Sequence, residues 1–202
     1  MNAFATTDVG IERNVNQDYV YAKLDDIGCL PNLFIVADGM GGHKAGDTAS
    51  RYTVETLVEL LKESEGKDPL ATIDNNIKLV NTLLLRKAGE SEEYNGMGTT
   101  LVVASIFDNT LRVANVGDSR LYVITRAIGG YDTVEAEMFS VDLKKEDMIL
   151  MCSDGLTNML EDQEIFHIIK SSHDIREAAE RLVSRANDNG GRDNISVILI
   201  EP

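Results

Sequence analysis

Five aspartates stand at the ends of short apolar runs, where carboxylates can be brought together: Asp18, Asp38, Asp118, Asp154 and Asp193. A single aspartate in such a place is typical of a turn, in which the carboxylate accepts a hydrogen bond from its own backbone. Several in one sheet system could converge at one rim, where carboxylates without a cation repel one another and take up protons. Mg²⁺ and Mn²⁺ prefer oxygen ligands and would relieve that repulsion. The pattern makes a divalent metal site a candidate beside the simpler interpretation as turns.

The elements that must position these aspartates are short strands. Runs rich in valine, isoleucine and leucine are typical of buried strands. Asp108-Asn109 separates two of these runs and predicts a hairpin turn. The predicted strands are Leu33 to Ala37, Thr99 to Phe107, Thr110 to Val116, Arg120 to Thr125, Met148 to Cys152 and Ile195 to Ile200.

Apolar residues at helical spacing predict four helices. One covers Lys44 to Lys62, and a second starts at Asp68-Pro69 and carries an apolar stripe from Leu70 to Leu84. A shorter one covers Asp162 to Ser171, and Asp174 caps the last. The helices come in pairs between blocks of strands. This order favours antiparallel sheets covered by helices over a doubly wound parallel fold.

The composition limits the class of protein. A length of 202 residues is typical of one domain, and 43% hydrophobic residues suffice for a folded core. The net charge of −15 repels phosphate backbones and anionic lipids, so we expect binding neither to nucleic acid nor to membranes. Cys29 and Cys152 form no CxxC pair, and residues 1–10 have no basic region followed by an apolar run. We therefore expect a reduced, cytoplasmic protein without a signal peptide.

The glycine-rich stretch from Asp38 to Gly46 joins a predicted strand to a predicted helix, as a nucleotide site does. It fits neither the P-loop, which would need lysine at Asp47, nor GxGxxG from Gly39, which would need glycine at Lys44. We interpret the glycines as letting the backbone approach a metal ion or its waters. His43 lies in this stretch, and a catalytic role has equal weight with a purely structural one.

Six motifs, in order along almost the whole chain, resemble those of the metal-dependent protein phosphatase 2C (PPM) family of Ser/Thr phosphatases. One motif alone would be weak, but six in family order are specific. Met40 stands where many eukaryotic members carry histidine, so the chain is similar to the bacterial branch. The motifs are Thr7-Asp8-Val9-Gly10 with Arg13 and Asn16-Gln17-Asp18, then Val36 to His43, Gly96 to Leu101, Asn115 to Arg120, Cys152 to Leu156 and Arg192 to Ser196.

The resemblance implies an α+β fold, a four-layer α-β-β-α sandwich of two antiparallel β-sheets flanked by helices, and this agrees with the predicted elements. It implies one catalytic domain over residues 1–202 and two Mn²⁺ or Mg²⁺ ions at one end of the sandwich, with a possible third. Asp38 would bridge the first two ions, and Asp118 with Asp154 would hold the third. Carried over by motif, the metal ligands are Asp18, Asp38, Gly39, Asp118, Asp154 and Asp193.

The resemblance also implies the reaction and its partners. A water molecule activated by the metal ions would attack the phosphorus of phosphoserine or phosphothreonine without a phosphoenzyme. Arg13 would grip the phosphate, because its planar fork can donate two parallel hydrogen bonds. Asp38 would be catalytic through the metals it bridges, and His43 or a metal-bound water would protonate the leaving alkoxide. The implied partners are phosphorylated proteins and a bacterial Ser/Thr kinase that the enzyme opposes, and we expect a monomer.

Two departures from the family pattern affect these expectations. Gln17 stands where many members have glutamate, so Asp18 must carry that corner of the site. Between Val123 and Gly130 the chain is short of the few dozen residues that form a flap beside the active site in most bacterial members. This flap is absent, was engineered out, or was left out of the numbered sequence near residues 124–125. We favour omission, because every other motif is intact.

Two other classes of function compete with the enzyme. The same rim could make the chain a catalytically weak scaffold that binds phosphoproteins, which the short flap region favours and the intact aspartates disfavour. The chain could also be a plain divalent-cation-binding domain. Metal-dependent hydrolysis of a small aryl phosphate separates the three.

Overall fold

Runs of branched aliphatic residues form two antiparallel β-sheets in the computed structural model, which describes residues 1–41, 45–66, 68–124 and 138–202. The first sheet has the strand order β1 (Asn2–Asp8), β10 (Ile195–Glu201), β9 (Met148–Cys152) and β7 (Arg120–Ile124). The second has the order β2 (Asp18–Lys23), β3 (Leu33–Met40), β5 (Leu101–Phe107), β6 (Thr110–Val116) and β8 (Phe139–Asp142), with the short β4 (Gly98–Thr99) paired to β3.

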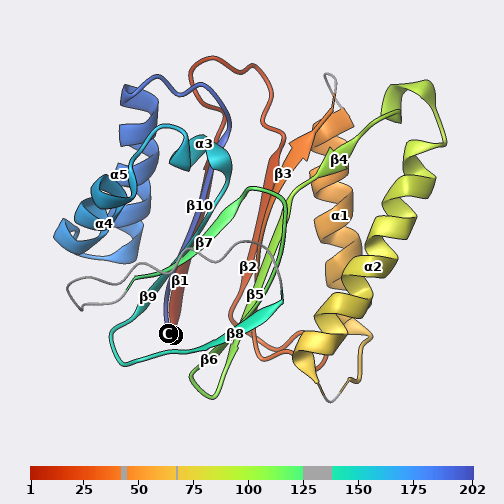
Figure 1. Cartoon of the computed structure of the whole chain (residues 1–202), viewed down its shortest axis with the longest axis horizontal. Coiled ribbons are helices and arrows are strands. Elements are labelled where there is room, and N and C mark those ends of the chain that lie inside the picture. Colours follow the sequence, from red (N-terminus) through yellow and green to blue (C-terminus); the bar gives the residue numbers. More distant parts are fainter. Residues whose placement is uncertain (42–44, 67, 125–137) are drawn as a thin grey trace.

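Helices cover the outer face of each sheet (Figure 1). Helices α1 (Ala45–Lys62) and α2 (Pro69–Ala88) lie against the second sheet, and α4 (Asp162–Ser171) and α5 (Ile175–Asp188) lie against the first. The one-turn helix α3 (Asp154–Thr157) follows β9 directly, and a 3₁₀ turn, η1 (Glu92–Tyr94), precedes β4. The expected four-layer α-β-β-α sandwich is confirmed.

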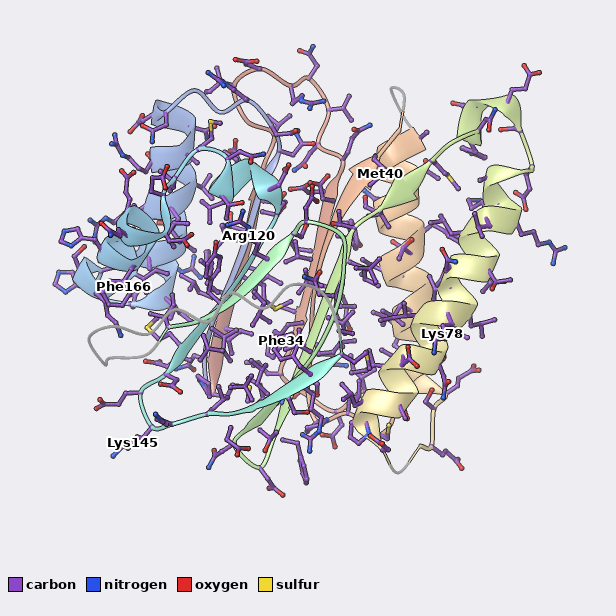
Figure 2. The ribbon with its side chains drawn as sticks, viewed as in Figure 1. Phe34, Met40, Lys78, Arg120, Lys145 and Phe166 are labelled. Atoms are coloured by element: carbon purple, nitrogen blue, oxygen red, sulfur yellow. The ribbon has the colours of Figure 1, made fainter. Side chains whose placement is uncertain are left out.

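Both faces of the central strands are buried, and successive side chains point to opposite faces. In β3, Phe34 and Val36 point into the core between the two sheets, whereas Leu33 and Ile35 point toward α1 and α2. Phe34 lies near the middle of the molecule in Figure 2. Strand β10 alternates in the same way between the central core and the helices of the first sheet. Each central strand therefore contributes to two cores, and this gives the continuous apolar runs of the sequence.

The two ends of the described chain lie side by side. Strand β1 pairs with β10 along its whole length, from Asn2 opposite Glu201 to Asp8 opposite Ile195. Strand β1 is the edge of its sheet and is only partly buried, so it carries threonine and alanine in place of a long aliphatic run. For this reason the apolar pattern missed it, and it missed the edge strand β8 in the same way.

Local signals predicted turns and caps correctly. Asp108 and Asn109 both have positive φ, 49° and 57°, in the tight hairpin between β5 and β6. The side chain of Asp68 accepts hydrogen bonds from the first turn of α2, and Asp174 does the same for α5. The predicted start of the first helix, Lys44, lies outside the described residues, as do His43 and Thr125, the predicted flap junction. No helix in the described ranges combines the length and the hydropathy that a membrane crossing requires.

Candidate active site

One end of the sandwich gathers the strand ends that carry the five aspartates (Figure 1). Asp18 begins β2 and lies opposite Asp38 of β3 in the ladder. Asp154 starts α3 just after β9, Asp193 precedes β10, and Asp118 lies in the turn between β6 and β7. The antiparallel register of β2 and β3 places the first two acids together, and the sandwich places the other three beside them.

A pocket of about 290 Å³ opens at this end between the two sheets. Four of the five aspartates line it, and the fifth, Asp18, is almost completely buried beside them, with 5% of its surface exposed. The lining residues are Arg13, Gln17, Asp38, Gly39, Met40, Gly41, Thr100, Asp118, Asp154, Asp193 and Asn194.

Among the described residues, no side chain or backbone group lies in good hydrogen-bond geometry with either oxygen of the buried Asp18 carboxylate. Burial raises the pKa of Asp18 to about 6, and the neighbouring Asp193 and Asp154 add to the rise. The hydroxyls of Ser196 and Ser153 lie near the carboxylate and lower its pKa, but the effect of burial is larger. An unpartnered buried carboxylate is costly, so this position calls for a cation.

The carboxylates of Asp38 and Asp154 are also destabilised in their ionised form. Burial raises the pKa of Asp38 to about 8, reinforced by the negative charges of Asp18, Asp154 and Asp193. Burial also raises the pKa of Asp154, with contributions from Asp193 and Asp118. One oxygen of Asp154 is buried without a partner, and the other accepts a hydrogen bond from Asn158 at 2.9 Å. The cluster holds more carboxylate than it can keep ionised at neutral pH unless positive charge enters.

The donor set therefore fits hard divalent cations, which take carboxylate, carbonyl and water oxygens. In the part of the chain that the structure describes, no three carboxylate, imidazole or thiol side chains are already arranged to hold one ion. Ions shared between pairs of carboxylates, with water and a backbone carbonyl completing each shell, suit this arrangement.

Two threonines hold the backbone of Asp38 in place through hydrogen bonds, and neither was assigned a role from the sequence. The hydroxyl of Thr100 accepts a hydrogen bond from the Asp38 amide at 3.0 Å, and the hydroxyl of Thr99 donates to the Asp38 carbonyl at 2.8 Å. The Thr100 hydroxyl is paired in turn with that of Ser119 at 2.8 Å. Both threonines belong to the family motif from Gly96 to Leu101. Their place in this motif was the signal that could have indicated a role in the site.

Gly39 lies where three backbone segments come close together. A Cβ atom on Gly39 would lie 2.1 Å from the carbonyl oxygen of Gly46 and 2.6 Å from that of Gln17. Gly39 also donates its amide to the Gln17 carbonyl at 3.1 Å. Glycine is therefore required where β3, the start of α1 and the residue before Asp18 come together.

Arg13 lies at the mouth of the pocket on the loop between β1 and β2. Its Nη2 donates to a carboxylate oxygen of Asp193 at 2.7 Å, and its Nε donates to the carbonyl of Arg192 at 3.3 Å. The side chain is half exposed, so the guanidinium faces both the acidic cluster and solvent. This places a guanidinium group, the predicted phosphate-binding cation, next to the candidate metal ligands.

Asn194 fastens the loop that carries Arg13, and this role was missed from the sequence. Its side-chain amide donates to the carbonyls of Val9 at 2.8 Å and Val15 at 3.0 Å, and its oxygen accepts from the amide of Gln17 at 2.8 Å. The residue is buried and follows Asp193 directly. One side chain thus joins both ends of the Arg13 loop to the segment that carries Asp193, just before β10.

The remaining predicted site residues have mixed outcomes. Gln17 lines the pocket and Asp118 lies exposed at its edge, on the turn after β6. The predicted catalytic residue His43 lies outside the described residues. The structure therefore brings the five aspartates, Gly39 and Arg13 to one pocket.

Comparison with known proteins agrees with this geometry. A family model described as Protein phosphatase 2C matches residues 11–134, and a second with the same description matches residues 124–195. The serine/threonine phosphatase stp of Listeria monocytogenes is 34% identical, with 100% of this chain and 96% of the relative covered. That alignment spans 245 positions against 202 residues here, so part of the relative has no counterpart in this chain.

Solved structures share the fold over nearly their whole length. Serine/threonine phosphatase Stp1 from Staphylococcus aureus superposes with a TM-score of 0.87 at 29% identity, covering 99% of this chain and 94% of that one. The catalytic domain of the serine/threonine protein phosphatase PstP, solved in complex with two manganese ions, gives a TM-score of 0.84 at 27% identity. It covers 98% of this chain and 96% of its own.

Proposed function

The chain belongs to the protein phosphatase 2C family and is a metal-dependent protein serine/threonine phosphatase, and we propose that the pocket lined by its aspartates is the active site. The observation that carries the assignment is the set of buried carboxylate oxygens of Asp18 and Asp154 that have no hydrogen-bond partner within the described part of the chain. A protein that only needed a stable fold would pair or remove such oxygens.

We propose two metal ions, Mn²⁺ or Mg²⁺, in this pocket. Asp18, Asp38, Asp154 and Asp193 with the carbonyl of Gly39 would hold them, and Asp38 would be shared between the two. A third ion would lie between Asp118 and Asp154. When bound, the ions supply a water nucleophile at neutral pH and offset the negative charge of the phosphoryl oxygens.

Arg13 is proposed to bind and orient the phosphate of the substrate. Its guanidinium has five N–H donors in a planar fork, of which Nη2 is used on Asp193 and Nε on the Arg192 carbonyl. The ion pair with Asp193 holds the fork at the mouth of the pocket, so a phosphate can be received without a large rearrangement of the side chain. The phosphorus is thereby aligned with the acidic cluster.

The leaving serine or threonine oxygen needs a proton when the phosphate ester breaks. Met40 lines the pocket and cannot donate one. We propose that His43, three residues along the same junction, or a water molecule of the site supplies it. The reaction then consumes one water and releases phosphate and the free hydroxyl of the protein.

The wider biology of the chain is a proposal of the same kind. The substrates are phosphorylated proteins, and we propose that the chain opposes a bacterial Ser/Thr kinase as a cytoplasmic monomer. We also propose that residues 1–202 form one catalytic domain whose flap is missing near residues 124–125. The proposed metal ligands and Arg13 are not part of the flap. Its loss would therefore affect the choice of protein substrate more than the hydrolysis of a small ester.

The decisive experiment combines turnover with metal binding. Wild-type protein is expected to hydrolyse 4-nitrophenyl phosphate and a phosphothreonine peptide with Mn²⁺, to lose both activities with a chelator, and to bind Mn²⁺ in calorimetry. Asp38→Asn is expected to lose turnover and to bind Mn²⁺ more weakly. Asp25→Asn, which changes an exposed acid in the loop between β2 and β3, is the matched control. Mn²⁺ binding without turnover on either substrate would favour a scaffold instead of an enzyme.

A further inference from the structure

Exposed apolar side chains are concentrated around the mouth of the pocket. Ten large hydrophobic side chains are exposed in the described part of the chain, and half of them belong to the segments that form this mouth. Ile11 is 68% exposed and Met40 is 55% exposed. We call these five residues the apolar rim: Val9, Ile11, Val15, Met40 and Val116.

Each member of the apolar rim is attached to the pocket. Met40 lines it and stands at the end of β3 in Figure 2. The carbonyls of Val9 and Val15 accept the hydrogen bonds of Asn194, itself a lining residue. The amide of Ile11 donates at 2.8 Å to the carbonyl of Gly191, two residues before Asp193.

Val116 completes the rim from another element. It ends β6, and the next residue, Gly117, packs so closely that a Cβ atom there would lie 2.8 Å from the Thr100 side chain in the pocket wall. The rim therefore draws on the β1–β2 loop, the end of β3 and the end of β6, and each of these segments also carries residues that line the pocket or lie next to them.

Single exposed hydrophobic residues are normal on protein surfaces, but a group beside a functional pocket indicates a binding surface. Three of the five come from one short loop, whose backbone is held by Asn194 and Gly191. A rigid loop binds with little loss of conformational entropy. Leu79 and Leu85 of α2 are exposed to a similar degree but lie on the outer helix layer, away from any aspartate of the cluster.

The charge around the rim selects against acidic partners. Glu12 stands exposed between two rim residues, and the whole chain carries a net charge of −15, whereas the bound ions and Arg13 would compensate the aspartates inside the pocket. An acidic segment beside the phosphate would meet this field at close range. An apolar segment would meet apolar side chains and avoid the repulsion.

We propose that the apolar rim binds aliphatic or aromatic side chains next to the phosphorylated residue, so that the enzyme prefers phosphoprotein segments with apolar neighbours over segments with acidic ones. This inference rests on the proposed function, because it places the phosphate between Arg13 and the aspartates. The occupant is a substrate segment, since the rim is continuous with the pocket that takes the phosphate.

The test uses three phosphothreonine peptides that differ only in the residues flanking the phosphothreonine: leucine, serine or glutamate. Wild-type kcat/KM is expected to be about tenfold higher for the leucine peptide than for the glutamate peptide, the range that small apolar contacts provide. The double variant Ile11→Ser, Val116→Ser is expected to lose most of this preference through a lower kcat/KM for the leucine peptide. Leu85→Ser, equally exposed on α2, is the matched control and should retain the preference.

The outcomes separate the inference from the proposed function. If wild type hydrolyses neither the peptides nor 4-nitrophenyl phosphate, the proposed function fails and the rim proposal fails with it. If it hydrolyses all three peptides equally, or if Leu85→Ser has the same effect as the rim variant, only the rim proposal is overturned. Equal peptide rates together with a dimer that Ile11→Ser dissociates would assign the rim to a second copy of the chain. Should the double variant melt at a lower temperature, Val15→Ser alone repeats the test.

Discussion

The two ends of the sandwich treat a buried polar side chain in opposite ways. At one end Asn32, 3% exposed, donates to the carbonyl of Ile106 and accepts from its amide, both at 2.7 Å. At the other end Asp18, 5% exposed, has no hydrogen-bond partner on either oxygen. The two residues flank neighbouring strands of one sheet and are buried almost equally. Burial alone therefore does not separate a structural polar group from a functional one; at the Asp18 end the unpartnered group is a carboxylate that lies beside other carboxylates.

The contrast has an energetic meaning. A paired buried group stabilises the fold modestly, whereas an unpaired one costs about 1–3 kcal/mol. At the Asn32 end the fold has no such cost. At the Asp18 end it tolerates the cost in the metal-free protein, and a bound cation would offset it. Four changes would break or sharpen this comparison.

The largest effect is expected at the centre of the acidic end. Asp38→Asn removes one charge from the cluster without adding bulk, and kcat with Mn²⁺ is expected to fall by about a thousandfold, or about 4 kcal/mol of activation free energy. The metal-free variant should unfold at a higher temperature than wild type, because a repelled carboxylate is gone. Steady-state kinetics and thermal melts in chelator measure both. Wild-type activity in the variant at saturating Mn²⁺ would contradict the bridging role.

The next largest effect, on stability, is expected at the end of the sandwich that contains Asn32. Asn32→Ala leaves the amide and carbonyl of Ile106 without their partners, and the free energy of unfolding is expected to fall by about 2–3 kcal/mol. The kcat at 25 °C should stay within about twofold, since the residue lies at the far end of β3 from Asp38. Urea denaturation and the standard phosphatase assay give the two values. Asn75→Ala, at an exposed position of α2, is the control. A loss of activity larger than the loss of stability explains would remove the distinction between the two ends.

Arg13→Ala should have a smaller effect, confined to the substrate. We expect kcat/KM to fall by about 10- to 100-fold, because one charged, bidentate contact to phosphate is lost. Mn²⁺ affinity should change by less than about threefold and stability by less than about 1 kcal/mol, because the ion pair with Asp193 is partly exposed. Kinetics, calorimetry and melting measure these in turn. A larger loss of Mn²⁺ affinity than of kcat/KM would make Arg13 part of metal binding.

The smallest effect is a pH dependence of stabilisation by metal. In the metal-free fold the pKa of Asp18 is raised to about 6 and that of Asp38 to about 8, above the ordinary value of 3.8. A raised folded-state pKa contributes stability that is fully present below about pH 4 and is lost as pH rises through about 6 and 8. Mn²⁺ should therefore raise the melting temperature by several degrees more at pH 8 than at pH 5. Asp18→Asn should reduce the difference, and equal shifts at both pH values in wild type would contradict it.

Much of this architecture could be predicted from local patterns. The central strands are apolar on both faces, so their runs stood out, and Asp68, Asp174 and Asp108-Asn109 carry cap and turn chemistry that depends only on neighbours. The convergence of the aspartates followed from their places at strand ends. Edge strand β1 escaped because half-exposed strands need few aliphatic residues.

Other parts of the site could not be predicted, because their roles rest on contacts between distant segments. Asn194 binds carbonyls 185 and 179 residues away, and no local pattern announces such partners. Thr100 serves Asp38 across 62 residues. The family resemblance identified Asn194 and Thr100 as motif residues but did not imply a role for either. Only the pairing of strands turns these polar side chains into supports for the site.

The pairing of β1 with β10 has a consequence for synthesis. A ribosome makes β1 long before β10, so β1 lacks the strand with which it pairs in the described structure until β10 has emerged. Arg13 follows β1, and Asp193 precedes β10, so the two residues of this ion pair meet only at that moment. Pairing between distant segments is slow and comes late in folding. A chain that lacks β10 is therefore expected to lack phosphatase activity, because neither the β1 pairing nor the Arg13–Asp193 ion pair can form.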